Sequence, residues 1–335
     1  MKCLGSYIIL TLLSIVSVFS APPSRYLERN VEIGDFKYHL YSDGKATIYK
    51  VLEDDLEEVT IPGSIEYNHK YYLVNEIAAK TFTNKSIYKI IVDSSNTDLL
   101  IKKNAFYETR LCKEFAVYSQ YVSAEIGGFS GIGNYVQFLG AGIPHLVDTY
   151  SEKLLKKWNL PVRKNYQYVK DSERNEELIK LGEKVQETFG HYDNAAYPNS
   201  VANVMFMGVG SSEGLSRLYR VIAITMGIPD DEVLAGGDNI HFSWNYVKIN
   251  IGKGKKWYIL DIIKTTEWNV YKGFTTDAKK VEYLKSFYGE YYDIKASNFV
   301  IFNNRYNYPY ESRYNYNLTE NFNSWLSRNN GGIRA

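Results

Sequence analysis

Three residues in the second half of the chain are of the types that a serine hydrolase uses: Ser212, His241 and Asp261. Ser212 lies in the pentapeptide GSSEG, which has the G-x-S-x-G form of a nucleophile elbow. A serine hydroxyl attacks an acyl carbon when a histidine takes its proton and a carboxylate orients that histidine. These residue types therefore predict acyl transfer or hydrolysis, provided that the fold brings them together.

An α/β-hydrolase elbow needs a strand before the serine and the chain order Ser, acid, His. The apolar residues VMFM (204–207) are the candidate strand, and His241 is the last histidine in the sequence. Apart from the adjacent Glu213, the acids between Ser212 and His241 lie close to the histidine; they are Asp230, Asp231, Glu232 and Asp238. The first half also shows short repeated strands where parallel βαβ units would be required. Both features argue against this hydrolase fold.

Two amphipathic helices are expected to position Ser212. Residues 173–190 predict the first, which stops at Gly190 and has an apolar face formed by Leu178, Leu181, Val185 and Phe189. After Gly210, apolar residues recur at helical spacing until GIP (227–229) ends the second helix; they are Leu215, Leu218, Tyr219, Ile222 and Met226. Ser212 is therefore expected at a helix N-terminus.

Four motifs in this half occur in the order and spacing of a known family. They are GSSEGLS (210–216), GIP (227–229), HFSWNYVKI (241–249) and KWYILDI (256–262). Together they resemble the transglutaminase-like domain over about residues 174 to 265. The resemblance implies a papain-like arrangement of Cys, His and Asp, on a fold in which helices precede an antiparallel sheet.

The sequence departs from that family at its catalytic positions. Ser212 stands in the place of the cysteine, whose thiolate is a far better nucleophile than a hydroxyl at neutral pH. The family's histidine lies two residues before the tryptophan, where this chain has Phe242, whereas His241 lies three residues before Trp244. Because side chains alternate along a strand, His241 is expected on the opposite face from Trp244 unless Ser243 is an inserted bulge residue. Asp261 matches the third position, although an Asp that ends a strand is often only a capping group.

The other histidines give no further site. His39, His69 and His145 lie in the first half or the junction, and His191 is expected to be a solvated turn residue after the first helix. No pair has metal-ligand spacing, and the sequence has no H-E-x-x-H, C-x-x-C or phosphate-binding glycine loop. We therefore expect neither a metal nor a cofactor.

The first half contains a short repeat. Its segments VNEIAAKTFTN, LLIKKNAFYET and SAEIGGFSGIG can be superposed, with Phe82, Phe106 and Phe129 at equivalent positions; Ile77, Ile101 and Ile126 precede them. A period in the low twenties is typical of a solenoid whose units bury their apolar faces against one another. Each unit is expected to be a strand, a turn and an apolar plug.

The repeat resembles the BspA-type leucine-rich repeat over about residues 45 to 140. TIPGSIEYNHKYYLVNEIAAKTF matches the opening unit, whose pattern is an "IP" strand followed by an "I-G-x-x-A-F" turn. In the first turn Ala-Ala-Lys replaces the glycine, and the third unit is expected to have lost two residues between Ile126 and Phe129. The resemblance implies a surface or secreted protein that binds other proteins or cells. Alternatively, so short an array only packs against the second half of the chain.

These patterns predict an α+β chain with five segments. Residues 1–20 resemble a secretory signal peptide, and 21–145 form a degenerate leucine-rich-repeat domain. A helical junction is expected over 146–170, a transglutaminase-like domain over 171–290, and a Tyr- and Asn-rich C-terminal segment over 291–335. No later run approaches the roughly 20 apolar residues of a membrane span.

Composition excludes some partners. The formal charge is +1, which gives no electrostatic footprint for nucleic acid or an anionic membrane surface. If Cys3 leaves with the signal peptide, Cys112 is the one remaining cysteine, so no internal disulfide can form and a buried, inert thiol is expected. Asn84 and Asn317 stand in sequons and are candidate glycosylation sites in a eukaryotic secretory pathway.

Three functions are compatible with the sequence. The first is a secreted interaction protein that binds a protein or carbohydrate and whose transglutaminase-like domain is an inactive scaffold. The second is a serine-variant acyltransferase or hydrolase with Ser212 as nucleophile, His241 as base and Asp261 as orienting group. The third is a carbohydrate or cell-wall binder that uses some of the 31 tyrosines.

Overall fold

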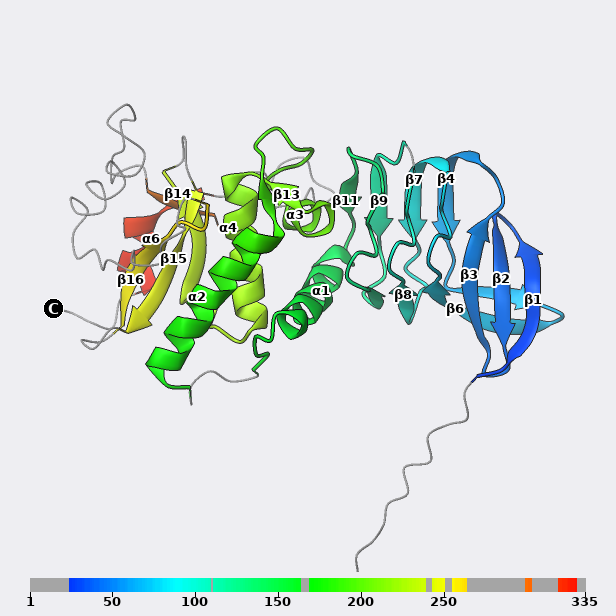
Figure 1. Cartoon of the computed structure of the whole chain (residues 1–335), viewed down its shortest axis with the longest axis horizontal. Coiled ribbons are helices and arrows are strands. Elements are labelled where there is room, and N and C mark those ends of the chain that lie inside the picture. Colours follow the sequence, from blue (N-terminus) through cyan, green and yellow to red (C-terminus); the bar gives the residue numbers. More distant parts are fainter. Residues whose placement is uncertain are drawn as a thin grey trace, which may run out of the picture.

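The structure is a computed structural model of the chain that describes residues 24–109, 111–163, 169–238, 243–250, 255–263, 299–302 and 319–329. Its first half is an array of short strands, and its second half consists of helices followed by a sheet (Figure 1). The helices pack against one end of the strand array, and the antiparallel sheet lies beyond them (Figure 1).

An antiparallel meander opens the strand array. Strands β1 (Tyr26–Ile33), β2 (Phe36–Tyr41) and β3 (Lys45–Val51) pair in sequence order, and β3 then pairs with β6 (Lys70–Ile77) in parallel. A hairpin joins β5 (Ser64–Tyr67) to β6. The meander buries alternate residues, including Phe36, Tyr38 and Leu40, as expected of strands with one face on a core. It therefore covers the first end of the repeat.

The repeat forms two parallel ladders. One runs β3-β6-β8-β10, with β8 at Leu99–Ile101 and β10 at Val122–Ala124. The other runs β4-β7-β9-β11, with bounds Asp55–Ile61, Ser86–Val92, Glu114–Val117 and Gln137–Leu139. Stacked units that pair strand on strand are the architecture of a solenoid, so the predicted repeat is confirmed.

The three phenylalanines of the repeat fill the space between the ladders. Phe82 and Phe106 are fully buried, and Phe129 is 2% exposed. The ring centroids are 4.8 Å apart between Phe82 and Phe106 and 5.7 Å apart between Phe106 and Phe129. Each ring thus contacts the ring of the next unit, as expected for apolar plugs that units bury against their neighbours.

The third unit has the same length as the others, which corrects one expectation. Ile77 pairs with Ile101, and Ile101 pairs with Ala124, so Ala124 and not Ile126 holds the equivalent strand position. The phenylalanine of each unit lies five residues after this position. The predicted loss of two residues is wrong, because Ile126 resembles a strand residue but lies in the turn.

The turn has the same backbone conformation in all three units. Lys80, Asn104 and Gly127, each three residues after the aligned strand position, have φ angles of 63°, 60° and 83°. This left-handed conformation favours glycine, but lysine and asparagine adopt it at a cost of about 1 to 2 kcal/mol. The backbone of the turn is therefore retained where the sequence motif has lost its glycine.

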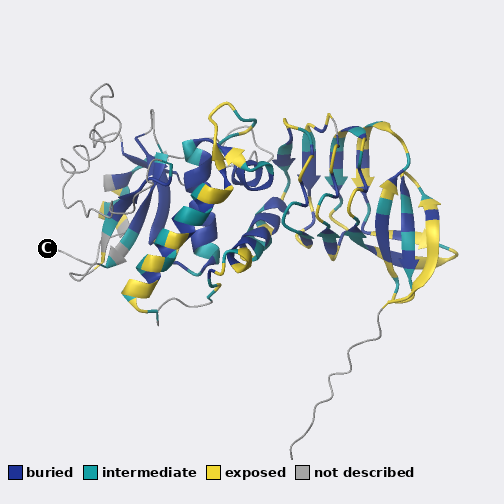
Figure 2. Ribbon diagram, viewed as in Figure 1, coloured by how far each residue is buried: buried dark blue, intermediate teal, exposed yellow. Residues whose placement is uncertain are grey.

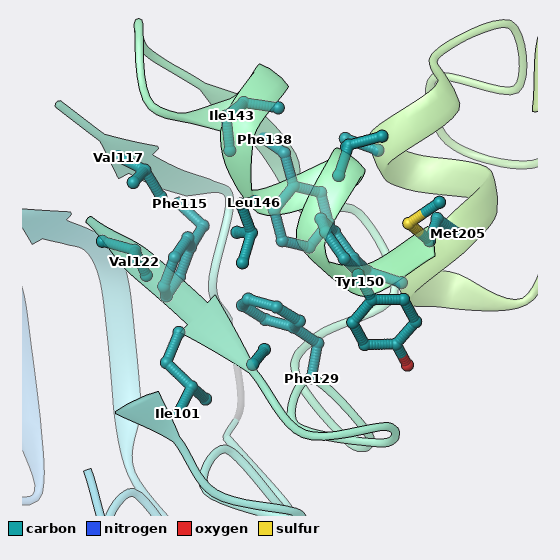
Figure 3. Packing of buried hydrophobic residues seen from close by; sticks show 14 of the residues in the cluster. Ile101, Phe115, Val117, Val122, Phe129, Phe138, Ile143, Leu146, Tyr150 and Met205 are labelled. Atoms are coloured by element: carbon teal, nitrogen blue, oxygen red, sulfur yellow. The ribbon is translucent and has the colours of Figure 1, made fainter. Parts of the chain in front are cut away.

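Helix α1 (Ile143–Lys157) and helix α3 (Val201–Met207) cover the second end of the array. Helix α1 contacts β10, and α3 contacts β11. Phe206 of α3 continues the line of aromatic plugs, with its ring centroid 4.5 Å from that of Phe129 and 5.0 Å from that of Phe138. Figure 3 shows the core at this end of the array, in which Leu146 and Tyr150 of α1 lie beside Phe129 and Phe138. Helix α1 covers the first part of the helical junction predicted over 146–170 and buries one face, and the core is continuous across it.

The second half follows the expected order of helices and then sheet. Helix α2 (Asp171–Thr188) precedes α3, and α4 (Ser212–Thr225) follows it. Strands pair antiparallel in the order β16-β15-β14-β17-β18, with bounds Lys255–Leu260, Ser243–Asn250, Val233–Gly237, Val300–Phe302 and Thr319–Asn321. Helix α4 packs on β14 and β15, whereas α6 (Phe322–Asn329) packs against the other face of the sheet.

Both predicted helix faces are buried. Leu178, Leu181 and Val185 of α2 are fully buried, and an exposed stripe runs along the opposite side of this helix (Figure 2). In α4, Leu218, Tyr219 and Ile222 are also fully buried. None of the helices in the described ranges has a stretch long and apolar enough to cross a membrane.

Candidate functional site

Ser212 is the first residue of α4, as predicted, and Ser211 is the N-cap. The Ser211 hydroxyl accepts a hydrogen bond from the Gly214 backbone N–H at 3.1 Å, which satisfies one of the free donors of the first turn. The residues before them are not a strand: VMFM (204–207) belongs to α3, which is capped by Ser200 and by Gly208 at φ 80°. The hydrolase elbow is thus wrong, because a short apolar run has no period that separates strand from helix.

The two glycines of GSSEG are required by close packing. A Cβ on Gly214 would lie 2.0 Å from the Pro198 carbonyl oxygen and 2.7 Å from Val204 Cγ2. A Cβ on Gly210 would lie 2.3 Å from the same Val204 methyl group. The glycines let α3 and the loop before it approach the start of α4, which fixes the backbone around Ser212.

A buried polar network holds the same turn from the other side. Asn199 accepts a hydrogen bond from the Ser211 hydroxyl and donates one to Glu213 Oε2 at 3.1 Å. Glu213 Oε1 accepts from Arg217 Nε at 2.9 Å, and the Arg217 guanidinium lies 4.6 Å from the ring centroid of Phe302. Burial lowers the pKa of the Arg217 guanidinium, which Glu213 opposes by favouring the charged form. The one sequence signal for this network is the i,i+4 spacing of Glu213 and Arg217, which favours an ion pair on a helix.

The Ser212 side chain is outside that network. It is half-buried, and its hydroxyl makes no hydrogen bond with any residue in the described parts of the chain. Position 212 therefore combines a fixed backbone, the partial positive charge of a helix N-terminus and an unengaged side chain. Such an environment favours the thiolate form of a cysteine and so increases its nucleophilicity. It increases the nucleophilicity of a serine hydroxyl less.

The predicted partners of Ser212 are described only in part. His241 and Phe242 lie outside the described residues. Asp261 follows the last residue of β16, is 5% exposed and accepts a hydrogen bond from the Ile263 N–H at 3.0 Å. It therefore has the capping contact that the sequence also allowed.

The register of the sheet places Asp261 near the start of α4. Leu260, the residue before Asp261, pairs with Asn245 of β15, whose side-chain amide donates to the Ser216 carbonyl at 2.7 Å. Ser216 lies about one helical turn after Ser212. Ser212 and Asp261 are thus at the same end of the contact between α4 and the sheet.

Trp244 lies on the face of the sheet that points away from α4. It packs with Tyr246 and Phe299 in a cluster that α6 completes, whereas the neighbouring Asn245 contacts α4. The face opposite Trp244, on which the sequence places His241, is therefore the face of the sheet that contacts α4. Strand alternation relative to Trp244 does not exclude His241 as a partner of Ser212.

His191, rather than His241, is the described histidine that lies beside GSSEG. Strand β12 (Gly190–His191) pairs in parallel with β13 (Val209–Gly210), and His191 lies opposite Gly210. His191 Nε2 is 3.1 Å from Asp193 Oδ1. The expected exposure is confirmed, since 39% of the His191 side chain is accessible. Its proximity to GSSEG was missed, because a two-residue strand pair has no sequence signal.

The other candidate residues that the structure describes include His39 and Asn84. Burial lowers the pKa of His39, which stacks on Tyr49. The described residues contain no group of three His, Cys, Asp or Glu side chains that could hold a metal ion. Asn84 is exposed in a turn with φ 60°, so it remains a candidate glycosylation site, whereas Asn317 is outside the described ranges.

Cys112 is expected to be unreactive in the folded protein. Its side chain is 1% exposed, and burial raises the pKa of the thiol to about 12. At pH 8 the thiolate fraction is then on the order of 10⁻⁴, and reagents cannot reach the sulfur. Iodoacetamide should leave Cys112 unlabelled in the native protein and should label it in urea. Rapid labelling under native conditions would contradict this burial.

The first half is a leucine-rich-repeat type of solenoid. Its strands form parallel ladders, its phenylalanine plugs are 23 or 24 residues apart, and each unit buries one of them. No protein-family model matches the chain, and no curated protein matches it.

Solved structures of leucine-rich-repeat proteins are similar to about a third of the chain. A leucine-rich cell surface protein from Faecalibacterium prausnitzii is 20% identical, with a TM-score of 0.28, over 36% of this chain and 31% of its own. A leucine-rich repeat protein from Bacteroides capillosus is 20% identical, with a TM-score of 0.26, over 34% of this chain and 100% of its own. The pneumococcal vaccine antigen PcpA is 17% identical, with a TM-score of 0.20, over 33% of this chain and 34% of its own.

Proposed function

We propose that the chain is an extracellular interaction protein that binds a protein partner through its repeat. Residues 1–20 would direct its export, and the second half would be a transglutaminase-like scaffold that lacks the thiol chemistry of that family. The order of elements supports the scaffold: position 212 begins α4, and the strands that carry Trp244 and Trp257 follow in an antiparallel sheet. A serine at position 212 leaves no thiolate there.

The observation that carries the proposal is a sheet face whose strands β4, β7 and β9 extend beyond the described helices. The outward residues of the β4-β7-β9-β11 ladder form two rows across the strands, here called the ladder face. They are Glu58, Lys89, Glu114 and Gln137 in one row and Thr60, Ile91 and Leu139 in the other, in which the small side chain of Ala116 is buried. The helices contact this ladder through its end strand β11, and β4, β7 and β9 extend away from them (Figure 1).

The chemistry of the ladder face suits a protein partner. Its first row is mixed in charge, with Lys89 Nζ 2.9 Å from Glu58 Oε2; this contact raises the pKa of the lysine. Such an exposed ion pair adds little stability. Its second row is mainly apolar, with Ile91 and Leu139 half-buried, and Tyr118 lies exposed beyond the end of β9. Apolar and aromatic groups with a polar rim are the usual composition of a protein interface.

The test is binding of the full mature chain to a panel of immobilised extracellular-matrix and cell-surface glycoproteins, measured by biolayer interferometry. We expect Ile91→Glu with Leu139→Glu to weaken binding at least about 10-fold, because both charges would be buried in the interface. The control is Val162→Glu, since Val162 is an apolar residue that is 51% exposed and lies outside the ladder face.

Equal losses from the ladder and control variants, or an absence of binding across the panel, would refute the proposal. Binding that disappears when the panel is enzymatically deglycosylated would assign the ligand to carbohydrate instead. A carbohydrate ligand should depend on exposed tyrosines rather than on Ile91 and Leu139, because sugar faces stack on aromatic rings.

A further inference from the structure

We infer that His191, oriented by Asp193, is the proton acceptor of Ser212, and that these three residues form a site for ester hydrolysis. The inference goes beyond the interaction function and does not depend on it. It also replaces His241, the histidine that sequence order offers, with one that the tertiary structure brings to the start of α4.

Two backbone contacts fix the loop that carries His191 against the start of α4. At one end His191 pairs with Gly210, and the Tyr192 N–H donates to the Gly210 carbonyl at 2.8 Å. At the other end the Ser211 N–H donates to the Pro198 carbonyl at 3.0 Å. Ser212 therefore directly follows the two residues, Gly210 and Ser211, to which both ends of residues 191–198 are attached.

The hydroxyl that is free to react is that of Ser212 and not that of Ser211. Ser211 accepts from Gly214 and donates to Asn199, so its proton and one lone pair are engaged. The Ser212 hydroxyl has no hydrogen-bond partner among the described residues. Placement at the first helical position also leaves backbone N–H groups of the first turn nearby, which can stabilise a developing oxyanion.

Of the described residues around position 212, we assign the role of base to His191. Glu213, the adjacent acid, is held by Arg217 and Asn199. Asp193 contacts His191 through Nε2, which leaves Nδ1 of the imidazole for the serine proton. A carboxylate on one ring nitrogen and a hydroxyl near the other is the arrangement by which a triad selects the tautomer of its base.

The reaction is an ordinary acyl transfer to water. The Ser212 oxygen bonds to the ester carbonyl carbon as its proton passes to His191 Nδ1, and the imidazolium then protonates the departing alcohol. Water attacks the acyl-serine, gives its proton to His191, and the serine oxygen leaves with that proton to release the acid. Tyr192 and Tyr197 of the same loop are 56% and 41% exposed, so we expect an ester with an aromatic or other apolar group.

A cysteine at position 212 tests the geometry without requiring turnover. In Ser212→Cys of a chain that lacks residues 1–20, the new thiol is accessible whereas the remaining thiol, Cys112, is buried. The pH dependence of iodoacetamide labelling gives its pKa, which we expect below about 7 with an imidazolium and a helix N-terminus beside it. Adding His191→Gln should raise this thiol pKa by at least about 1, whereas adding His241→Gln should leave it unchanged.

Catalysis is tested on the wild-type chain with a fluorophosphonate probe. We expect the probe to label Ser212, and His191→Gln to slow the labelling at least about 100-fold, the lower limit of a general-base contribution. Asp193→Asn should slow labelling less and shift its pH profile. His191 is an exposed residue, so the thermal unfolding midpoint of its variant should match that of the wild type.

Several results would overturn the inference. A thiol pKa in Ser212→Cys that does not respond to His191→Gln would show that His191 is out of reach, and a response to His241→Gln would assign the base to that residue instead. Failure of the probe to label the wild type, or equal labelling of Ser212→Ala, would exclude Ser212 as a nucleophile. None of these results bears on the ladder face, whose variants are tested by binding.

Discussion

Replacing Phe106 by alanine is expected to destabilise the protein by about 3 to 5 kcal/mol, the usual cost of removing a buried aromatic side chain and leaving its cavity. Phe106 is fully buried between Phe82 and Phe129, and its ring also contacts that of Phe115 at a centroid distance of 5.2 Å. Rigid strands on both sides prevent the neighbouring units from closing the cavity. Urea denaturation gives the change in free energy of unfolding.

Tryptophan fluorescence shows how far the effect spreads. All five tryptophans follow residue 145, so their emission reports only on the second half. Because Phe129 contacts Phe206 and the core is continuous, we expect Phe106→Ala to lower the midpoint detected by tryptophan as much as that detected by far-ultraviolet circular dichroism. The control is Tyr107→Ala, which removes a neighbouring ring that is 43% exposed and should cost less than about 1 kcal/mol. An unchanged tryptophan midpoint in Phe106→Ala would show that the halves unfold independently.

Replacing Gly214 by alanine is expected to destabilise the protein by about 2 to 3 kcal/mol. In an ordinary helix the same change would be stabilising by about 0.5 to 1 kcal/mol. Here the new methyl group would lie 2.0 Å from the Pro198 carbonyl oxygen, so loop and helix would have to separate. The change is measured by urea denaturation and should also abolish the protection of the Ser211 N–H, which bonds to that carbonyl.

Two variants separate this steric effect from other causes. Ser212→Ala, two positions earlier in α4, removes an unengaged hydroxyl and should change stability by less than about 0.5 kcal/mol. Adding Val204→Ala to Gly214→Ala removes the side chain 2.7 Å from the new methyl group but leaves the closer backbone oxygen. We therefore expect no rescue from the second change. Full recovery of stability in the double variant would contradict the assignment of the clash to Pro198.

Elements with a regular apolar period were predictable from the sequence. The 24- and 23-residue spacing of Phe82, Phe106 and Phe129 indicated the solenoid, and the helical spacing after Gly210 indicated α4 with Ser212 at its start. Burial of one face imposes such periods locally, so they can be read along the chain. Short segments without a full period were assigned incorrectly, as with VMFM (204–207) and Ile126.

Local spacing and composition were enough to establish the repeat, the two helices with a regular apolar period, and the residue types available for chemistry. The contacts between these residues were visible only in the three-dimensional structure. The two-residue pairing of His191 with Gly210, the close approach of Pro198 to Gly214 and the sheet face taken by Trp244 join segments that are distant along the chain. Such contacts depend on how whole elements pack in three dimensions, and no local pattern encodes them.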